Sequence, residues 1–404
     1  MSQARDASGP SDSKSERNVI FEGGPDSLRA HFSRILGSLT PPIHSDSGCT
    51  NGESTEDHFE RYLSHVLLNT SADALSTGIG QVDQSPFFDI RPVCTADKSR
   101  FESLFELNFQ AQISDGIWRW KYSDPSQASI IAFHNAEPAG FYGAIPRNWF
   151  ALGERLKSVQ ICDVMVSKQY RGILTTRRGL LAQMASSIRD VYIGSLSGAA
   201  FGFGFPNDRH LRLGVKLALY REAEKLKEMR WQSIDSSTNF PWVIQEIKES
   251  DPLISVAGHL WPQMKEGFNH SLIAERDPKY LVHRFLEHPV KTYKCYSIRN
   301  ICSRDPEVLV ILQKEDAICR LVDIIGNPRS MPAGIHAVRR ISHQIGCSQV
   351  LAWGSHFMVD LLKEGVSEIT HEGPSFALMT TNDALETRLL AMPTWVSMAD
   401  ADFT

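Results

Sequence analysis

The chain has 404 residues, enough for two domains and an extension, and its 42% hydrophobic and 22% charged residues are ordinary for a globular protein. The formal net charge of −5 argues against a nucleic-acid-binding protein that depends on phosphate contacts. No apolar run has the length of a membrane span, and no signal-peptide core is present. The seven cysteines lack CxxC spacing, so we expect free thiols in a cytoplasmic protein and no metal site.

The N-terminal part, residues 1–85, predicts a partly disordered helical extension. Residues 1–17 contain almost nothing apolar, which is typical of a disordered tail. Residues 27–39 have the apolar spacing of a short helix, which the following prolines would end. A second helix fits residues 56–69, and a stretch rich in Ser, Gly and Asp follows it.

A folded domain is expected over residues 86–240. It begins with an alternating strand at 88–93 and a helix from Thr95 to Phe109. Two runs within 129–145 predict a hairpin with its tip near Asn135. The apolar, β-branched run at 159–166 predicts a buried strand, which we expect to be the next antiparallel neighbour.

A basic glycine loop follows this last strand. Gln169, Tyr170, Arg171 and Gly172 interrupt the apolar run, and apolar residues spaced three to four apart from Leu180 onward predict a helix. Such a turn directs backbone N–H groups and the positive end of the helix dipole at whatever lies above the loop. An anion the size of a pyrophosphate would suit this place.

This stretch resembles the acetyl-CoA-binding motif of the GNAT acyltransferases, which follows the pattern Gln/Arg-x-x-Gly-x-Gly/Ala. Gln169 and Gly172 match the pattern, whereas Leu174 stands where Gly or Ala is expected. The resemblance implies an α/β (α+β) fold with a mixed, mostly antiparallel sheet flanked by helices. It implies acetyl-CoA or another acyl-CoA as co-substrate, and no metal. The implied cofactor-binding residues are Val164, Met165, Val166, Arg171, Gly172, Ile173, Leu174, Thr175 and Thr176.

The segment after the loop helix, 199–207, alternates phenylalanine with glycine. Its phenylalanines would face one side of a strand and its glycines, Gly202 and Gly204, the other. In the GNAT fold this strand diverges from the one before the loop, and pantetheine threads the opening. The resemblance adds Asn207, at the start of a helix that we expect to run through Tyr220, to the cofactor-binding residues.

Residues 241–404 repeat the pattern and predict a second, degenerate GNAT-like domain. A hairpin is expected over 308–325, followed by helices at 333–345 and 356–364 and strands at 349–353 and 376–381, which would complete this half. Its segment around Asp323 resembles the one around Asp163, but no basic glycine loop follows.

Two residues are candidates for proton transfer. Asp163, on the strand before the loop, could accept the proton of the attacking amine. The matching Asp323 in the half without a loop favours a structural role for both carboxylates instead. Tyr220 would protonate the leaving thiolate, as a tyrosine of the last helix does in many GNAT enzymes, although core packing is an alternative reading.

The sequence thus predicts a cytoplasmic acyltransferase that moves an acetyl or other acyl group from acyl-CoA to the amine of a small-molecule acceptor. The amine would attack the thioester directly in a ternary complex. An acyl carrier protein remains an alternative carrier of the donor, and no nucleic acid or membrane partner is expected. Two other readings remain open: a FemAB-like aminoacyl transferase, and a non-catalytic protein that binds a CoA ligand or assembles with a partner.

Overall fold

The structure is a computed structural model that describes residues 87–122, 128–171, 178–194, 198–235 and 241–401. The N-terminal extension and its two expected helices lie outside the described residues. Among the described helices, none combines the length and apolar character that a bilayer crossing requires.

The first sheet is mixed and mostly antiparallel, as expected, and follows the order β1-β2-β3-β4-β5-β15-β6, with β9 and β16 attached through β3. Its expected hairpin is present, because Asn135 and Ala136 take positive φ angles of 51° and 67° between β2 and β3. The strand expected at 159–166 is the end of a longer strand paired antiparallel with β3. The strands are β1 Asp89–Pro92, β2 Ile130–His134, β3 Glu137–Ala151, β4 Glu154–Val166, β5 Phe201–Gly204, β6 Arg221–Lys225, β9 Leu272–Ala274, β15 Ser375–Met379 and β16 Thr394–Trp395.

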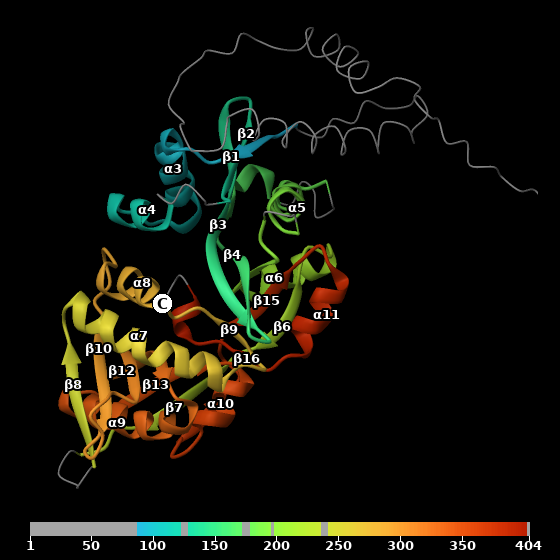
Figure 1. The fold of residues 1–404 in the computed structure, drawn as a ribbon. Helices are drawn as coiled ribbons and strands as arrows, with labels where there is room; N and C mark the ends of the chain where they lie inside the picture. Colours follow the sequence, from blue (N-terminus) through green and yellow to red (C-terminus); the bar gives the residue numbers. More distant parts are fainter. Residues whose placement is uncertain (1–86, 123–127, 172–177, 195–197, 236–240, 402–404) are drawn as a thin grey trace, which may run out of the picture. The chain divides into compact units, whose positions relative to one another are not determined.

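Helices cover both faces of the β2–β3–β4 region because successive residues of these strands, which face opposite sides, are mostly apolar (Figure 1). Ile131 and Phe141 pack with α3 and α4, the two helices that come before β2 in the chain. Their neighbours Ile130 and Tyr142 face the opposite way and pack with α5. The helices are α3 Lys98–Phe109, α4 Asp115–Tyr122 and α5 Leu180–Tyr192.

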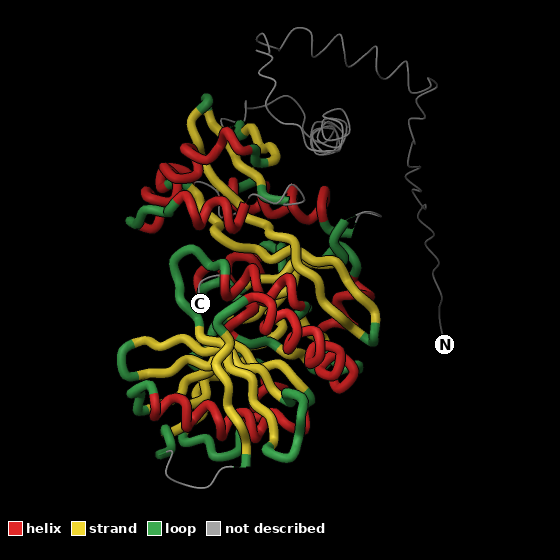
Figure 2. Tube along the Cα trace, turned by 60° about the vertical axis from the view of Figure 1, so that its left-hand side comes forward, coloured by secondary structure: helices red, strands yellow, loops and turns green. Residues whose placement is uncertain are grey.

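The second sheet has the order β14-β7-β13-β12-β11-β10-β8, and helices cover it on both faces (Figure 2). The hairpin expected over 308–325 is β11–β12, and the two helices expected after it are α9 and α10. The strands are β7 Lys227–Gln232, β8 Trp242–Ile247, β10 Lys294–Asn300, β11 Val308–Glu315, β12 Ile318–Gly326, β13 Gln349–Gly354 and β14 Glu368–Thr370. The remaining helices are α6 Asp208–Lys216, α7 Ser250–Gly267, α8 Pro278–Leu281, α9 Met331–Gln344, α10 His356–Leu362 and α11 Asp383–Ala391.

The two sheets exchange strands across residue 240. The sequence predicted that the strand at 376–381 would complete the second sheet. In the structure this strand, β15, lies between β5 and β6 of the first sheet instead. In return β7, which precedes residue 240, lies between β14 and β13 of the second sheet. Periodicity shows that a segment is a strand but does not show its partner, so this correction could not be read from the sequence. The division into domains at residues 86–240 and 241–404 therefore stays a prediction from the sequence.

Candidate functional site

The first sheet opens between β4 and β5. The two strands pair in parallel only from Ser158↔Phe201 to Ile161↔Gly204, although β4 continues to Val166. On its other edge β4 stays paired with β3 up to Gly140↔Val166. Residues 162–166 of β4 therefore have a strand neighbour on one side and none on the β5 side, which is the divergence expected from the sequence.

The backbone of Val166 faces this opening. The next residue, Ser167, donates its N–H to Ala139 of β3 at 2.8 Å, and successive residues of a strand direct their N–H groups to opposite sides. The carbonyl of Val166 accepts a hydrogen bond at 2.8 Å from Nε of Arg171, on the side away from β3. The N–H of Val166 is accordingly turned toward the open side, where a thioester oxygen would need a donor.

The other implied loop residues are placed differently. Arg171 also donates to Oδ1 of Asn108, so its guanidinium is bound to the protein. Met165 is 1% exposed and packs under α3 and α4, while Val164 is half buried beside α5. Gly172, Ile173, Leu174, Thr175 and Thr176 lie outside the described residues, which resume before Gly179, the N-cap of α5.

Asp163 occupies a β-bulge at the opening. Its φ is 45°, and the register between β3 and β4 shifts there, so that its carboxylate meets α4. Oδ2 accepts hydrogen bonds from Nζ of Lys121 at 2.9 Å and from the hydroxyl of Tyr122 at 2.5 Å. Burial, and after it the charge of Asp163, raise the pKa of Tyr122, which therefore acts as a hydrogen-bond donor. Only glycine fits opposite the bulge, since a Cβ at Gly143 would lie 2.9 Å from the Tyr122 hydroxyl.

The phenylalanine–glycine alternation of β5 is confirmed. Phe201 and Phe203 are buried in the core shared with the second sheet. A Cβ at Gly204 would be 3.1 Å from the carbonyl oxygen of Ile161 on β4, whereas a Cβ at Gly202 would be 3.0 Å from the side chain of Ile193. Gly204 thus lets β4 and β5 approach closely just before they separate.

Asn207 and Tyr220 lie at the two ends of the α6 region. Asn207 is the N-cap of α6, and its side chain accepts a hydrogen bond from the N–H of His210 at 2.9 Å. The helix ends at Lys216, earlier than expected, and Tyr220 folds back to donate to the carbonyl of His210 at 2.6 Å. Burial raises the pKa of the Tyr220 phenol.

The position of Tyr220 depends on a glycine, which gives a test of stability. A Cβ at Gly214 would overlap the Tyr220 ring. We expect Gly214→Ala to lower the free energy of unfolding by about 1–3 kcal/mol, because overpacking outweighs the gain in helix propensity. Gly258→Ala in α7 is the matched control: its nearest neighbour would be 3.9 Å away, so the propensity gain of up to about 1 kcal/mol remains. Equal effects of both substitutions in urea unfolding would contradict this packing.

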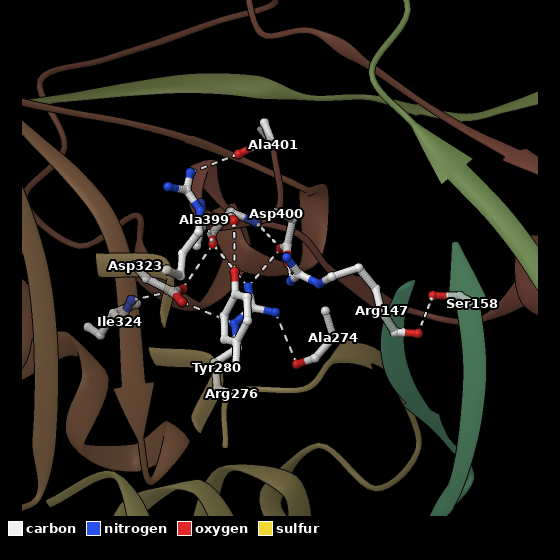
Figure 3. A network of polar contacts seen from close by, with 12 residues as sticks. Arg147, Ser158, Ala274, Arg276, Tyr280, Asp323, Ile324, Ala399, Asp400 and Ala401 are labelled. Carbon is white, nitrogen blue, oxygen red and sulfur yellow. Dashed lines mark hydrogen bonds and ion pairs between the residues drawn. The ribbon is translucent and has the colours of Figure 1, made fainter. Parts of the chain in front are cut away.

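A second carboxylate network lies at the bulge of β12 (Figure 3). The sequence points to Asp323 but does not predict its partners. Arg276, which is fully buried, donates to Asp323 at 3.0 Å and to Asp400 at 2.7 Å. Asp400 also lies 3.6 Å from the guanidinium of Arg147 on β3. This guanidinium stacks on the Tyr280 ring, 4.1 Å from the ring centroid. The similar segments around Asp163 and Asp323 were the only signal of this network in the sequence. The spacing of Arg147 and Arg276 does not indicate that they share a partner.

Residues 89–207 match the family described as "Acetyltransferase (GNAT) domain". A probable N-acyltransferase from Enterococcus faecalis V583 has a TM-score of 0.55 at 14% identity, covering 72% of each chain. A GCN5-related N-acetyltransferase from Kribbella flavida has a TM-score of 0.53 at 12% identity, covering 74% of this chain and 72% of its own.

A third solved structure is that of Saccharomyces cerevisiae N-myristoyltransferase with bound myristoyl-CoA and inhibitors. It has a TM-score of 0.50 at 10% identity and covers 87% of this chain and 92% of its own. The search of the curated proteins gave no match. At these identities the shared property is the fold, a mixed sheet flanked by helices.

Proposed function

We propose that this chain, which carries a GNAT domain at residues 89–207, is an acyltransferase that moves an acyl group from acyl-CoA to the amine of a small-molecule acceptor. The observation that carries the proposal is the opening of the first sheet beyond Ile161 and Gly204. It leaves the Val166 N–H on the side of β4 where pairing with β5 has ended. A thioester bound there would receive a backbone hydrogen bond on its carbonyl oxygen as the amine attacks.

In the proposed reaction, the amine nitrogen forms a bond to the thioester carbon, and the carbon–sulfur bond then breaks. The amine proton must leave, and the thiolate must gain a proton. We retain Asp163 and Tyr220 as candidates for these two steps. The proposed pyrophosphate site is the loop from Arg171 to Thr176, and the proposed compartment is the reducing cytoplasm, since the six described cysteines are free thiols.

One observation favours the non-catalytic alternative, in which the chain binds a CoA ligand without turnover. Both candidates for proton transfer are engaged elsewhere: Asp163 with Lys121 and Tyr122, and Tyr220 with the carbonyl of His210. Saturable binding of acyl-CoA with no transfer to a broad panel of amines would favour this alternative.

Binding of the donor is the first test. We expect saturable calorimetric binding of acetyl-CoA or of a longer acyl-CoA such as myristoyl-CoA, and its loss in the double variant Arg171→Glu, Gly172→Asp, because two negative charges would face the pyrophosphate. The expected loss of affinity is at least tenfold. Lys248→Glu is the control, since this side chain directly follows β8 of the second sheet and is 74% exposed. Unchanged binding in the double variant would refute the loop as the site.

A further inference from the structure

Besides Nε1 of Trp149, three buried polar atoms on one side of the β3–β4 ladder lack a hydrogen-bond partner: Nη2 of Arg147, Nε2 of Gln160 and Oδ1 of Asp400. Leaving a buried polar group unsatisfied is unfavourable, so such groups are few in native proteins and call for an explanation. Two of these atoms are donors, and both belong to the long hairpin that carries the bulge.

The register places both donors on the same face. Arg147 pairs with Ser158, and Ile145 pairs with Gln160. Cross-strand partners share a face, and so do residues two apart on one strand, which makes Arg147 and Gln160 diagonal neighbours. Cys162 continues this face toward the bulge, where its sulfur lies 3.6 Å from the Tyr122 hydroxyl that donates to Asp163.

The hydrogen bonding of Arg147 is incomplete, because its Nη2 has no hydrogen-bond partner. Oδ2 of Asp400 accepts hydrogen bonds from Nη2 of Arg276 at 2.7 Å and from the N–H of Ser397 at 3.0 Å. Arg147 is left with Oδ1 at 3.6 Å, which is an ion-pair distance but too long for a hydrogen bond. The side chain of Arg147 is 11% exposed, although its Nη2 atom is itself buried. Its planar donors suit the two oxygens of a carboxylate.

We infer that Arg147 and Gln160 bind a carboxylate of the acceptor, so that the acceptor is an amine that also carries a carboxylate. This inference rests on the proposed function, because it takes the bulge as the place where the amine reacts. Gln160 and Asp163 are three residues apart, or roughly 10 Å along the strand. That separation fits the side-chain amine of a diamino acid and exceeds the reach of an α-amine.

The test uses two pairs of amines that differ only by the carboxylate: L-lysine with cadaverine, and L-ornithine with putrescine. We expect the purified protein to acetylate the amino acid at least tenfold more efficiently in kcat/KM than the diamine, mainly through KM. In Arg147→Met the ratio should fall toward one, and Gln160→Leu should lower it as well. Arg155→Met is the matched control on the same hairpin, because Arg155 is 56% exposed and pairs with Glu275 at the surface.

Two further outcomes separate this inference from the proposed function. A ratio near one in the wild type, or a ratio that Arg147→Met does not change, would overturn the inference and leave acyl transfer intact. If no amine is acetylated, calorimetric titration of the same four compounds in the presence of CoA decides. Binding of an amino acid that Arg147→Met abolishes would support the carboxylate site while counting against acyl transfer, whereas equal or absent binding of both members of each pair would overturn the inference.

Discussion

Replacing Arg276 by methionine should lower the free energy of unfolding by about 3–5 kcal/mol, because it leaves Asp323 buried without this cation and leaves Asp400 only its 3.6 Å ion pair with Arg147. Arg276 is 0% exposed, and so are Asp323 and Asp400. Urea unfolding followed by circular dichroism measures the change. Arg276→Lys keeps the charge but loses the planar geometry, so we expect a smaller loss from that variant, which also serves if the methionine variant does not fold.

The pH dependence of Arg276→Met gives an independent signature. Burial raises the pKa of Asp323 even in the wild type, while Arg276 opposes that rise. Without Arg276 the folded protein holds protons more tightly than the unfolded chain, whose aspartate pKa is about 3.9. The stability of the variant therefore falls as the pH rises. The difference in free energy of unfolding between the wild type and Arg276→Met should shrink on acidification from pH 7 toward pH 4.

The control for Arg276→Met is Arg155→Met, which removes an ion pair at 56% exposure and should cost less than about 1 kcal/mol. A loss of similar size in both variants, or a deficit that does not depend on pH, would contradict the role assigned to Arg276.

The second large effect is expected at the bulge of β4. Asp163→Ala should lower the free energy of unfolding by about 3 kcal/mol, because the ammonium of Lys121 would lose this anion at only 8% exposure and Tyr122 would lose this acceptor. The measurement is again urea unfolding, and a loss below about 1 kcal/mol would contradict the assigned contacts.

A double variant separates anchoring from catalysis at Asp163. Lys121→Met with Asp163→Asn removes both charges, and we expect it to recover most of the stability lost in Asp163→Asn alone. If Asp163 only anchors the bulge, transfer should recover with stability. If Asp163 takes the amine proton, kcat should remain low in the double variant and lose its dependence on the ionisation of a carboxylate.

Local features of this chain could be predicted from the sequence because their causes are local. The β-branched run before the loop, the alternation in β5 and the helix after Asn207 follow from periodicity and capping, and the structure contains all three. The resemblance between the segments of Asp163 and Asp323 also has a structural counterpart, since β4 and β12 each carry a bulge against the preceding strand.

Long-range features could not be predicted, because they depend on which segments meet. The partners of Asp163 come from α4, and those of Asp323 come from Arg276 and from Ser397 near the end of the described chain. The place of β15 has the same origin, because a buried strand of five apolar or small residues fits the core of either sheet. Single-sequence periodicity carries no information about such choices.

The exchanged strand also orders events during synthesis. Strands β5 and β6 are complete by residue 225, but the strand that joins them, β15, ends at Met379. At roughly 5–20 residues per second the ribosome needs several seconds to deliver the missing segment. During that interval β5 lacks its β15 neighbour, and closing the sheet brings together residues about 150–175 positions apart, which makes this pairing a slow step in folding. The pairing of β5 and β6 through β15 is thus completed only after Met379 has been synthesised.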